Sequence, residues 1–276
     1  MAPGLYSVQI LAIALLLVST TSASDPGLNR ADSFGYVDPN GPAKWGSLSP
    51  KFTECSKGKH QAPVDIVKDE VVHKKSLKPL IRDYSPVNAT MINNGFNIEI
   101  KFEGHVGVLV ANGKNFTLMQ AHWHTPSEHR INGVQFPGEM HLVHRAADGN
   151  LSVVSVLYQY GAPDSFLTKI KRSLDELGKE QCAEHEESHI PLGIIDTKHM
   201  RRKSRKYYRY VGSFTTPPCT ENILWNILGK VRSISKEQIQ ALKAPLISSC
   251  KDNSRPIQPL NGRKIELYDE LARTTN

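Results

Sequence analysis

Four Asn-Gly or Asp-Gly dipeptides divide the middle of the chain, and they constrain its fold more than any other feature: Asn94-Gly95, Asn112-Gly113, Asn132-Gly133 and Asp148-Gly149. Such pairs favour tight turns between antiparallel strands, because Asn, Asp and Gly tolerate the positive φ that these turns need. The segments beside them are rich in Val, Ile, Leu and aromatic residues, which favour strands. We predict strands within residues 92–102, 105–124, 139–145 and 151–161.

Helical periodicity is confined to two segments. In residues 163–180, Asp164 can cap the start, and apolar residues recur at spacings of three and four. Residues 235–243 begin with Ser235 and Gln238 in the pattern of a capping box. The chain has 276 residues, 39% of them hydrophobic, and no internal repeat or linker. We therefore predict one mostly β domain with a few surface helices.

The N-terminus is typical of a secretory leader. Residues 1–24 carry no charged side chain, and an apolar stretch from Val8 to Val18 is followed by small residues. We predict a signal peptide over residues 1–23, with cleavage after Ala23 or Ser24. The alternative is a membrane anchor, but the stretch is short for a hydrocarbon core of about 30 Å. We expect no membrane span in the mature chain.

Cysteines and glycosylation sequons agree with passage through the secretory pathway. An even number of cysteines in an oxidising compartment suggests disulfides, and the four are Cys55, Cys182, Cys219 and Cys250. Asn-x-Ser/Thr sequons, the acceptors of N-linked glycans, occur at Asn88, Asn115 and Asn150. We therefore predict a secreted or lumenal glycoprotein.

The net charge is +7, and the uncharged leader leaves all of it on the mature chain. A basic protein can meet acidic polysaccharides or membrane surfaces. The densest basic run is Arg201 to Lys206, which is either a solvated loop or a patch that docks a polyanion. We expect no nucleic-acid partner, and the sequence does not indicate an oligomeric state.

Five of the eleven histidines fall within residues 120–145. His122 and His124 are two residues apart in a predicted strand, so both side chains point to one face, and His141 can lie beside them on the next strand. Zinc binds imidazole nitrogens, and three protein ligands leave a fourth position for water, as in catalytic sites. Because no cysteine lies near this cluster, we predict an open zinc site. Histidines that only face solvent or the core are the alternative.

Two polar residues are placed to orient these ligands. Gln120 and Glu139 each precede a proposed ligand by two residues and share its face. A metal-bound imidazole usually donates its other N–H to a carbonyl or carboxylate, and these side chains can accept it. His144 is three residues after His141 and so points to the opposite face. His129 follows a turn, and its spacing leaves open whether it is a ligand.

The stretch of residues 120–145 resembles the zinc-binding core of the α-class carbonic anhydrases, and its amino-acid sequence is most similar to that of the plant branch. The resemblance runs from about Phe34 to Leu267 and rests on seven segments in the family's order: FGY with NGPAKWG, KHQAPVDI, INNG, QAHWHTPSEH, EMHLVH, GSFTTPPCTE and NSRPIQPLNGR. It implies a domain over residues 30–270 with a central, mostly antiparallel twisted sheet of about ten strands. It also implies Zn²⁺ on His122, His124 and His141 at the bottom of a cone.

The activity that the resemblance implies is the reversible hydration of carbon dioxide to bicarbonate and a proton. Thr215 would accept the proton of a hydroxide in a hydrogen bond and pass its own to Glu128, while Thr216 would contact bicarbonate. Carbon dioxide would lie against four apolar residues, Val143, Val153, Phe214 and Trp225; Phe214 is bulkier than the leucine commonly found there. A secreted, apoplastic location is expected, with plastid delivery through the secretory route as the alternative.

The resemblance also implies a disulfide between Cys55 and Cys219, which would tie a strand after the N-terminal region to the loop that carries Thr215. Whether Cys182 and Cys250 pair stays open.

One departure concerns proton transfer. Fast members of the family have a histidine after the NNG element, whereas here Phe96 follows Gly95. Transfer needs a group that titrates near neutral pH, so we predict slow proton release at low buffer concentration. The alternative to an enzyme is a carbonic-anhydrase-like storage, defence or binding protein with little or no activity. The presence of all three proposed ligands, Thr215 and Glu128 favours the enzyme.

Overall fold

The computed structural model describes residues 34–179, 187–201 and 204–274; the predicted leader and Cys182 lie outside these ranges. Helices are few and mostly short: α1 (Trp45–Leu48), α2 (Glu54–Lys57), α3 (Ser165–Leu177), α4 (Lys236–Lys243) and α5 (Leu271–Thr274), with 3-10 turns η2 (Pro50–Phe52), η3 (Lys68–Glu70), η4 (Thr197–Met200) and η5 (Ser248–Cys250). None of the described helices is long and apolar enough to span a membrane.

Strands make up most of the regular structure. The first eight are β1 (Asp65–Ile66), β2 (Val72–His73), β3 (Ile81–Tyr84), β4 (Val87–Asn93), β5 (Ile98–Phe102), β6 (Gly107–Ala111), β7 (Lys114–His124) and β8 (Arg130–Ile131). The others are β9 (Val134–Gln135), β10 (Gly138–Arg145), β11 (Leu151–Tyr160), β12 (Ser188–Ile195), β13 (Lys206–Ser213), β14 (Glu221–Leu228), β15 (Arg232–Ile234) and β16 (Glu266–Asp269). The prediction of a mostly β protein is confirmed.

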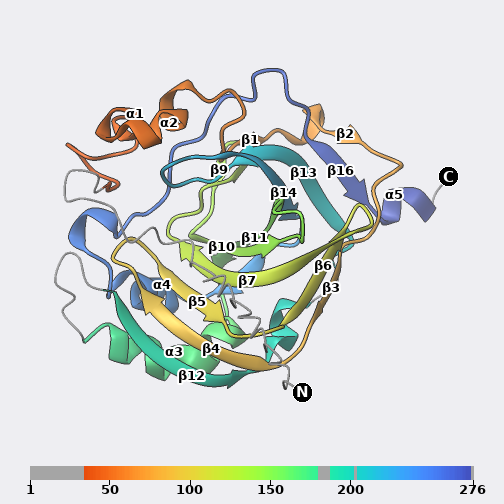
Figure 1. The fold of residues 1–276 in the computed structure, drawn as a ribbon. Coiled ribbons are helices and arrows are strands. Elements are labelled where there is room, and N and C mark those ends of the chain that lie inside the picture. Colours follow the sequence, from red (N-terminus) through yellow and green to blue (C-terminus); the bar gives the residue numbers. More distant parts are fainter. Residues whose placement is uncertain (1–33, 180–186, 202–203, 275–276) are drawn as a thin grey trace, which may run out of the picture.

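One large twisted sheet of 13 strands forms the body of the molecule (Figure 1). Its main path has the order β12-β4-β5-β7-β10-β11-β14-β13-β16-β2, with β3, β6 and β15 paired beside it. Most neighbours are antiparallel, whereas β11 pairs in parallel with β14 and β15, and β16 with β2. This confirms a mostly antiparallel sheet of about ten strands along its main path. A small second sheet joins β1, β8 and β9.

The predicted turns join adjacent strands. Asn112 and Gly113 have φ of 52° and 75° between β6 and β7, and Asn132 and Gly133 have φ of 48° and 75° between β8 and β9. Two successive residues with positive φ are the mark of the hairpin turn whose twist matches that of the strands. The local chemistry of these dipeptides therefore fixes where the chain reverses.

Both predicted helices begin at the predicted caps. The Asp164 side chain accepts hydrogen bonds from the backbone N–H groups of Phe166 and Leu167 at the start of α3. Ser235 and Gln238 form the capping box at the start of α4. Both helices lie along one side of the sheet in Figure 1, and their apolar faces are buried in the largest core cluster.

Two hydrophobic cores lie on opposite faces of the central strands. The larger one contains Trp123 and Leu142 together with the apolar face of α3. The smaller one contains Val143 and Trp225. Because side chains alternate along β7 and β10, the histidines next to Trp123 and Leu142 point toward the smaller core. β10 is buried over seven of its eight residues, so the histidine face is rigidly supported.

A disulfide joins Cys55 to Cys219, 164 residues apart in sequence. Cys55 lies in helix α2, so the expectation that this cysteine lies on a strand was wrong. Its buried side chain packs with Trp45, Phe52 and Cys219 in one cluster. Cys250 is free and buried.

Loss of this disulfide should destabilise the fold. It closes a long loop, and removing such a bond typically lowers the free energy of unfolding by about 2–5 kcal/mol. We expect reduced protein and a Cys219→Ser variant to unfold at lower denaturant concentration than the oxidised protein. Dithiothreitol should leave the unfolding of Cys219→Ser unchanged, which serves as the control. Equal midpoints for oxidised and reduced wild type would contradict the prediction.

Candidate metal centre

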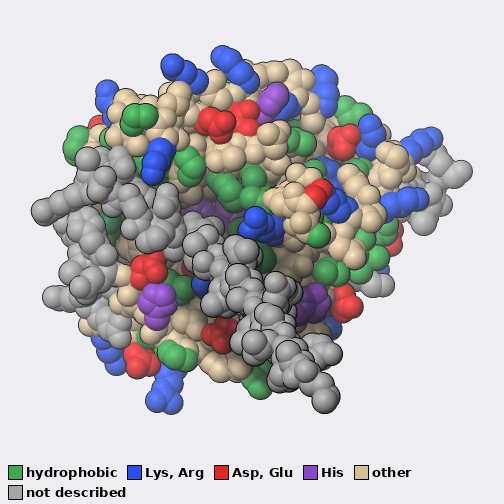
Figure 2. Space-filling model, in the orientation of Figure 1, with side chains coloured by type: hydrophobic (Ala, Val, Ile, Leu, Met, Phe, Trp, Pro, Cys, Tyr) green, Lys and Arg blue, Asp and Glu red, His purple; other side chains and the backbone are tan. Residues whose placement is uncertain are grey.

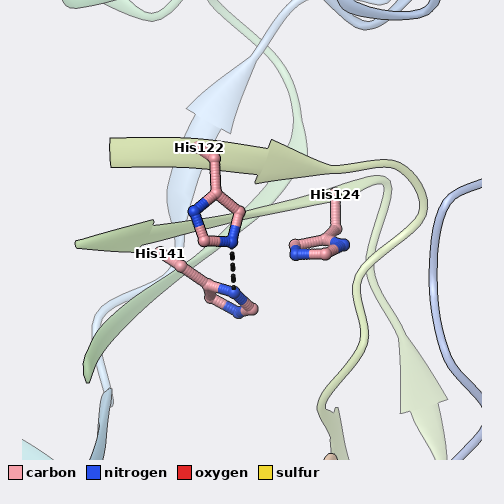
Figure 3. Close-up of side chains that lie close together, drawn as sticks. All are labelled: His122, His124 and His141. Carbon is pink, nitrogen blue, oxygen red and sulfur yellow. Dashed lines mark hydrogen bonds between the residues drawn. The ribbon is translucent and has the colours of Figure 1, made fainter. Parts of the chain in front are cut away.

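Three histidines converge on one face of the sheet. His122 and His124 lie on β7, and the register places His141 of β10 directly opposite His122. The ring centroids are 4.7–5.1 Å apart, and one nitrogen of each ring lies within 4.8 Å of the others. Figure 3 shows the three rings turned toward a common point. In the space-filling view of Figure 2, histidine side chains are recessed near the centre of the molecular surface shown.

Each imidazole is held by a hydrogen bond at the nitrogen that points away from the other rings. Nδ1 of His122 lies 2.7 Å from Oε1 of Gln120, and Nε2 of His141 lies 2.8 Å from Oε1 of Glu139. Nδ1 of His124 lies 2.6 Å from the backbone oxygen of Asn253. Gln120 and Glu139 therefore lie against the predicted ligands. Sequence reasoning missed Asn253, because a backbone carbonyl has no side-chain signal.

The remaining nitrogens fit a metal ion. Nδ1 of His141 and Nε2 of His122 face each other at 3.3 Å, and Nε2 of His124 is buried with no hydrogen-bond partner. Burial lowers the pKa of all three histidines, for His124 to about 4. Neutral imidazoles are the form that binds a metal. Three such nitrogens and no thiolate suit zinc with one position left for a small ligand.

Glu139 is the hub of the hydrogen bonds behind the three rings. Oε1 lies 2.7 Å from Nδ1 of His129 and accepts from Ser155 at 2.6 Å, in addition to His141. Oε2 accepts the backbone N–H groups of Glu128 and His129 at 2.9 and 2.8 Å. Burial alone would raise the pKa of this carboxyl, but the two histidines hold it well below its usual range. Glu139 is therefore a buried carboxylate that fixes the orientation of His141.

The other two histidines of the cluster lie behind the site. His129 bonds Glu139 at one ring nitrogen and the Tyr210 hydroxyl at the other, 2.7 Å away. Both of its nitrogens are thus occupied by hydrogen bonds, although His129, Glu139 and His141 also lie close enough together to hold a metal. His144 points to the other side of the sheet, where Nε2 lies 2.6 Å from the Tyr84 hydroxyl.

Glu128 and Thr215 are buried next to the three histidines. Oε1 of Glu128 lies 3.5 Å from Nδ1 of His124 and accepts the backbone N–H of Arg255 at 2.9 Å. Burial raises the pKa of Glu128 to about 7, while His141 and the approach of the Thr215 side chain act in the opposite direction. Oε2 of Glu128 is buried and has no hydrogen-bond partner. The contact from Arg255 was not predicted.

The four apolar residues predicted to receive substrate belong to one cluster. Val143, Val153 and Trp225 are buried in the smaller core, and the half-buried Phe214 packs against it. The Trp225 ring lies 4.8 Å from that of His141. Thr216 is half-buried, and its backbone oxygen accepts the Cys219 N–H at 2.9 Å. The histidine face is therefore bordered by apolar surface on one side.

The turn between β4 and β5 carries Phe96. Its half-buried ring packs on Phe34, with centroids 5.0 Å apart. The Asn253 side-chain amide donates to the Phe96 backbone oxygen at 2.8 Å, so the residue that holds His124 also anchors this turn. An apolar ring therefore occupies the turn between β4 and β5.

The fold and the site together define a class of protein, in which one β-sheet carries three imidazoles that can hold a metal ion. Residues 40–269 match the family model of the eukaryotic-type carbonic anhydrases. The chain belongs to this family.

Relatives and solved structures cover nearly all of the domain. Alpha carbonic anhydrase 7 of Arabidopsis thaliana is 39% identical over 271 residues, which are 97% of each chain. Dioscorin, solved in complex with ascorbate, is similar with a TM-score of 0.82 and 35% identity over 86% of this chain and 98% of that one. The α-carbonic anhydrase of Thermovibrio ammonificans, solved with the inhibitor sulfanilamide, is similar with a TM-score of 0.75 and 34% identity. The match covers 85% of this chain and 98% of that one.

Proposed function

We propose that the protein is a zinc-dependent lyase that catalyses the reversible hydration of carbon dioxide to bicarbonate and a proton. The observation that carries this proposal is the orientation of the three imidazoles. Gln120, Glu139 and Asn253 occupy one nitrogen of each ring, and the other nitrogens are left directed at a common point. His122, His124 and His141 are the proposed zinc ligands.

Zinc bound there would supply hydroxide at neutral pH, because it lowers the pKa of bound water to about 7. Thr215 would accept a hydrogen bond from the nucleophile and donate its own proton to Glu128, whose Oε2 is free to receive it. This pair would aim a lone pair of the nucleophile at the substrate. Thr216 would contact bicarbonate. The apolar cluster around Trp225 would hold carbon dioxide without reacting with it.

A second candidate function is a storage, defence or binding protein with little or no hydratase activity. It is favoured by the likeness to dioscorin, whose solved complex contains ascorbate. Zinc content and carbon dioxide hydration, measured together at low and high buffer concentration, distinguish the two. An enzyme is expected to hold one zinc and to hydrate carbon dioxide in proportion to it. Stoichiometric zinc without hydration would favour the second function.

Proton release should limit turnover at low buffer concentration. Phe96 cannot carry a proton, so transfer to solvent must rely on dissolved buffer. We expect activity to rise steeply with added imidazole, and a Phe96→His variant to show less of this dependence. Phe96→Leu is the matched control, since it changes the ring without adding a titrating group. Fast turnover in wild type at low buffer, unaffected by imidazole, would overturn the prediction.

We also propose a secreted glycoprotein, with residues 1–23 as a cleaved signal peptide and residues 30–270 as one domain. The three sequon asparagines, Asn88, Asn115 and Asn150, are all exposed, so a glycan on each would meet solvent. Protein from a eukaryotic secretory host should lose mass on treatment with an N-glycosidase and should begin near residue 24. Secreted protein with an intact leader and no glycan would contradict both expectations.

The proposed patch for a polyanion has less support. Arg202 and Lys203, two residues of the basic run, lie outside the described residues. Two of its described residues are already paired with carboxylates, Arg205 with Glu270 and Lys206 with Asp269, and in Figure 2 Lys and Arg side chains occur at many places on the face shown. A solvated loop is therefore the favoured interpretation of this run.

A further inference from the structure

Arg82 is a buried cation whose charge has no counterpart among the described residues. It lies in β3, at the margin of the sheet beside β6 (Figure 1), and its side chain is largely enclosed, with 7% of the residue exposed. Nη1 donates to the Met200 backbone oxygen at 3.1 Å. Nε and Nη2 are buried and have no hydrogen-bond partner. No carboxylate of the described residues forms an ion pair with it.

Burial lowers the pKa of Arg82 from its ordinary value, but an arginine side chain stays protonated in proteins, so it cannot relieve the cost of burial by losing its proton. Burial of a charge without a partner is strongly unfavourable, and each buried donor without an acceptor adds to that cost. The other arginine nearby does not share this deficit, since Arg232 pairs with Asp164 and donates to the His199 backbone oxygen. The unbalanced positive charge therefore belongs to Arg82.

A second unpartnered group lies on the segment that packs against Arg82. Thr197 is fully buried, and its hydroxyl has no hydrogen-bond partner. It belongs to η4, the same 3-10 turn that provides the Met200 carbonyl bound by Arg82. The turn η4 thus carries both the unpartnered hydroxyl of Thr197 and, three residues later, the carbonyl that accepts the hydrogen bond from Arg82. Two N–H donors of one guanidinium are suited to hold an anion in a fixed orientation.

We propose that Arg82 and Thr197 form a binding site for one small monovalent anion, of the size of chloride or bicarbonate, between β3 and η4. The site is separate from the metal centre. Arg82 is the register partner of Leu109, which pairs with Phe116 on β7. His122 is six residues further along that strand, a distance of roughly 20 Å. Leu109 also belongs to the larger core, on the opposite face from the histidines.

Bound anion would balance the buried guanidinium and so stabilise the folded state. At a concentration one hundred times its Kd, a ligand that binds only folded protein raises the ratio of folded to unfolded molecules about 100-fold. Melting temperatures are measured at constant ionic strength in sodium gluconate, chloride or bicarbonate. We expect chloride or bicarbonate to raise the Tm of wild type, and the two arms identify the preferred anion. Arg82→Met should lose this rise, and Thr197→Val should weaken it.

Two controls separate this site from others. Arg172→Met removes an exposed arginine and should keep the full response to the anion. A His122→Ala background removes anion binding at the zinc, so a response that persists there and disappears with Arg82→Met belongs to Arg82. Equal responses of wild type and Arg82→Met would overturn the proposal.

A crystal soaked in bromide gives a test that needs no variant to fold. We expect an anomalous peak within hydrogen-bond distance of Nε or Nη2 of Arg82. Water alone at that place, with bromide bound elsewhere, would also overturn the proposal. The outcome does not depend on the activity of the zinc centre.

Discussion

A His122→Ala variant is expected to fold, to purify without stoichiometric zinc and to hydrate carbon dioxide no faster than the uncatalysed reaction. Two imidazoles remain, and a catalytic zinc site needs three protein ligands to hold the ion. The fold should survive, because His122 is only partly buried and its neighbours on β5 and β10 pair through the backbone. Without the ion, no hydroxide is available at neutral pH. Elemental analysis measures the zinc content, and a pH-indicator assay measures the hydration of carbon dioxide.

Graded variants make this test sharper. Gln120→Ala removes only the acceptor of the His122 ring N–H, and such a loss typically lowers metal affinity 10–100-fold. We expect Gln120→Ala to regain activity in excess zinc, whereas His122→Ala should not. His189→Ala, at an exposed histidine on edge strand β12, is the control and should behave as wild type. Full activity of His122→Ala without bound metal would overturn the proposed function.

A Thr215→Val variant should keep its zinc and lose most of its activity. Valine has nearly the same shape, but it neither accepts a hydrogen bond from the nucleophile nor donates one to Glu128. Removing one oriented polar group from an active site typically lowers kcat about 100- to 1,000-fold. Stopped-flow measurements should therefore show slow hydration of carbon dioxide, while the zinc content stays at the wild-type value. Thr220→Val, on the exposed part of the same loop, should retain wild-type activity.

This result also separates the two candidate functions. A storage or binding protein would show no change in either quantity, because Thr215 would have no reaction to support. Stoichiometric zinc in both proteins, with equal hydration rates in wild type and Thr215→Val, would leave zinc as the metal and remove the assignment of Thr215 and Glu128 as the pair that orients the nucleophile.

Features set by neighbouring residues were predictable from the sequence. The turns at Asn112-Gly113 and Asn132-Gly133, and the caps of α3 and α4, depend on local chemistry alone. The shared face of His122 and His124 follows from strand parity. The position of His144 on the opposite face follows from the same rule, and it lies there.

Contacts between distant segments were not predictable in this way. Asn253 holds His124 through a backbone oxygen 129 residues away, and Arg255 reaches Glu128 through a backbone N–H. Neither has a side-chain pattern that the sequence could reveal. His129 was ambiguous because its partners, Glu139 and Tyr210, come from two other strands. Cys55 was expected on a strand, whereas it lies in helix α2 and packs with Trp45 and Phe52 around Cys219.

The five hydrogen bonds that Glu139 accepts come from three different segments of the chain, and none of them involves a metal. These bonds belong to the fold itself, so we expect the ligand frame to stay assembled when the proposed zinc ion is absent. In a cell, the fraction of active molecules would then follow the zinc supply of the compartment rather than the yield of folding. Metal-free protein would stay folded and could bind zinc when the ion becomes available.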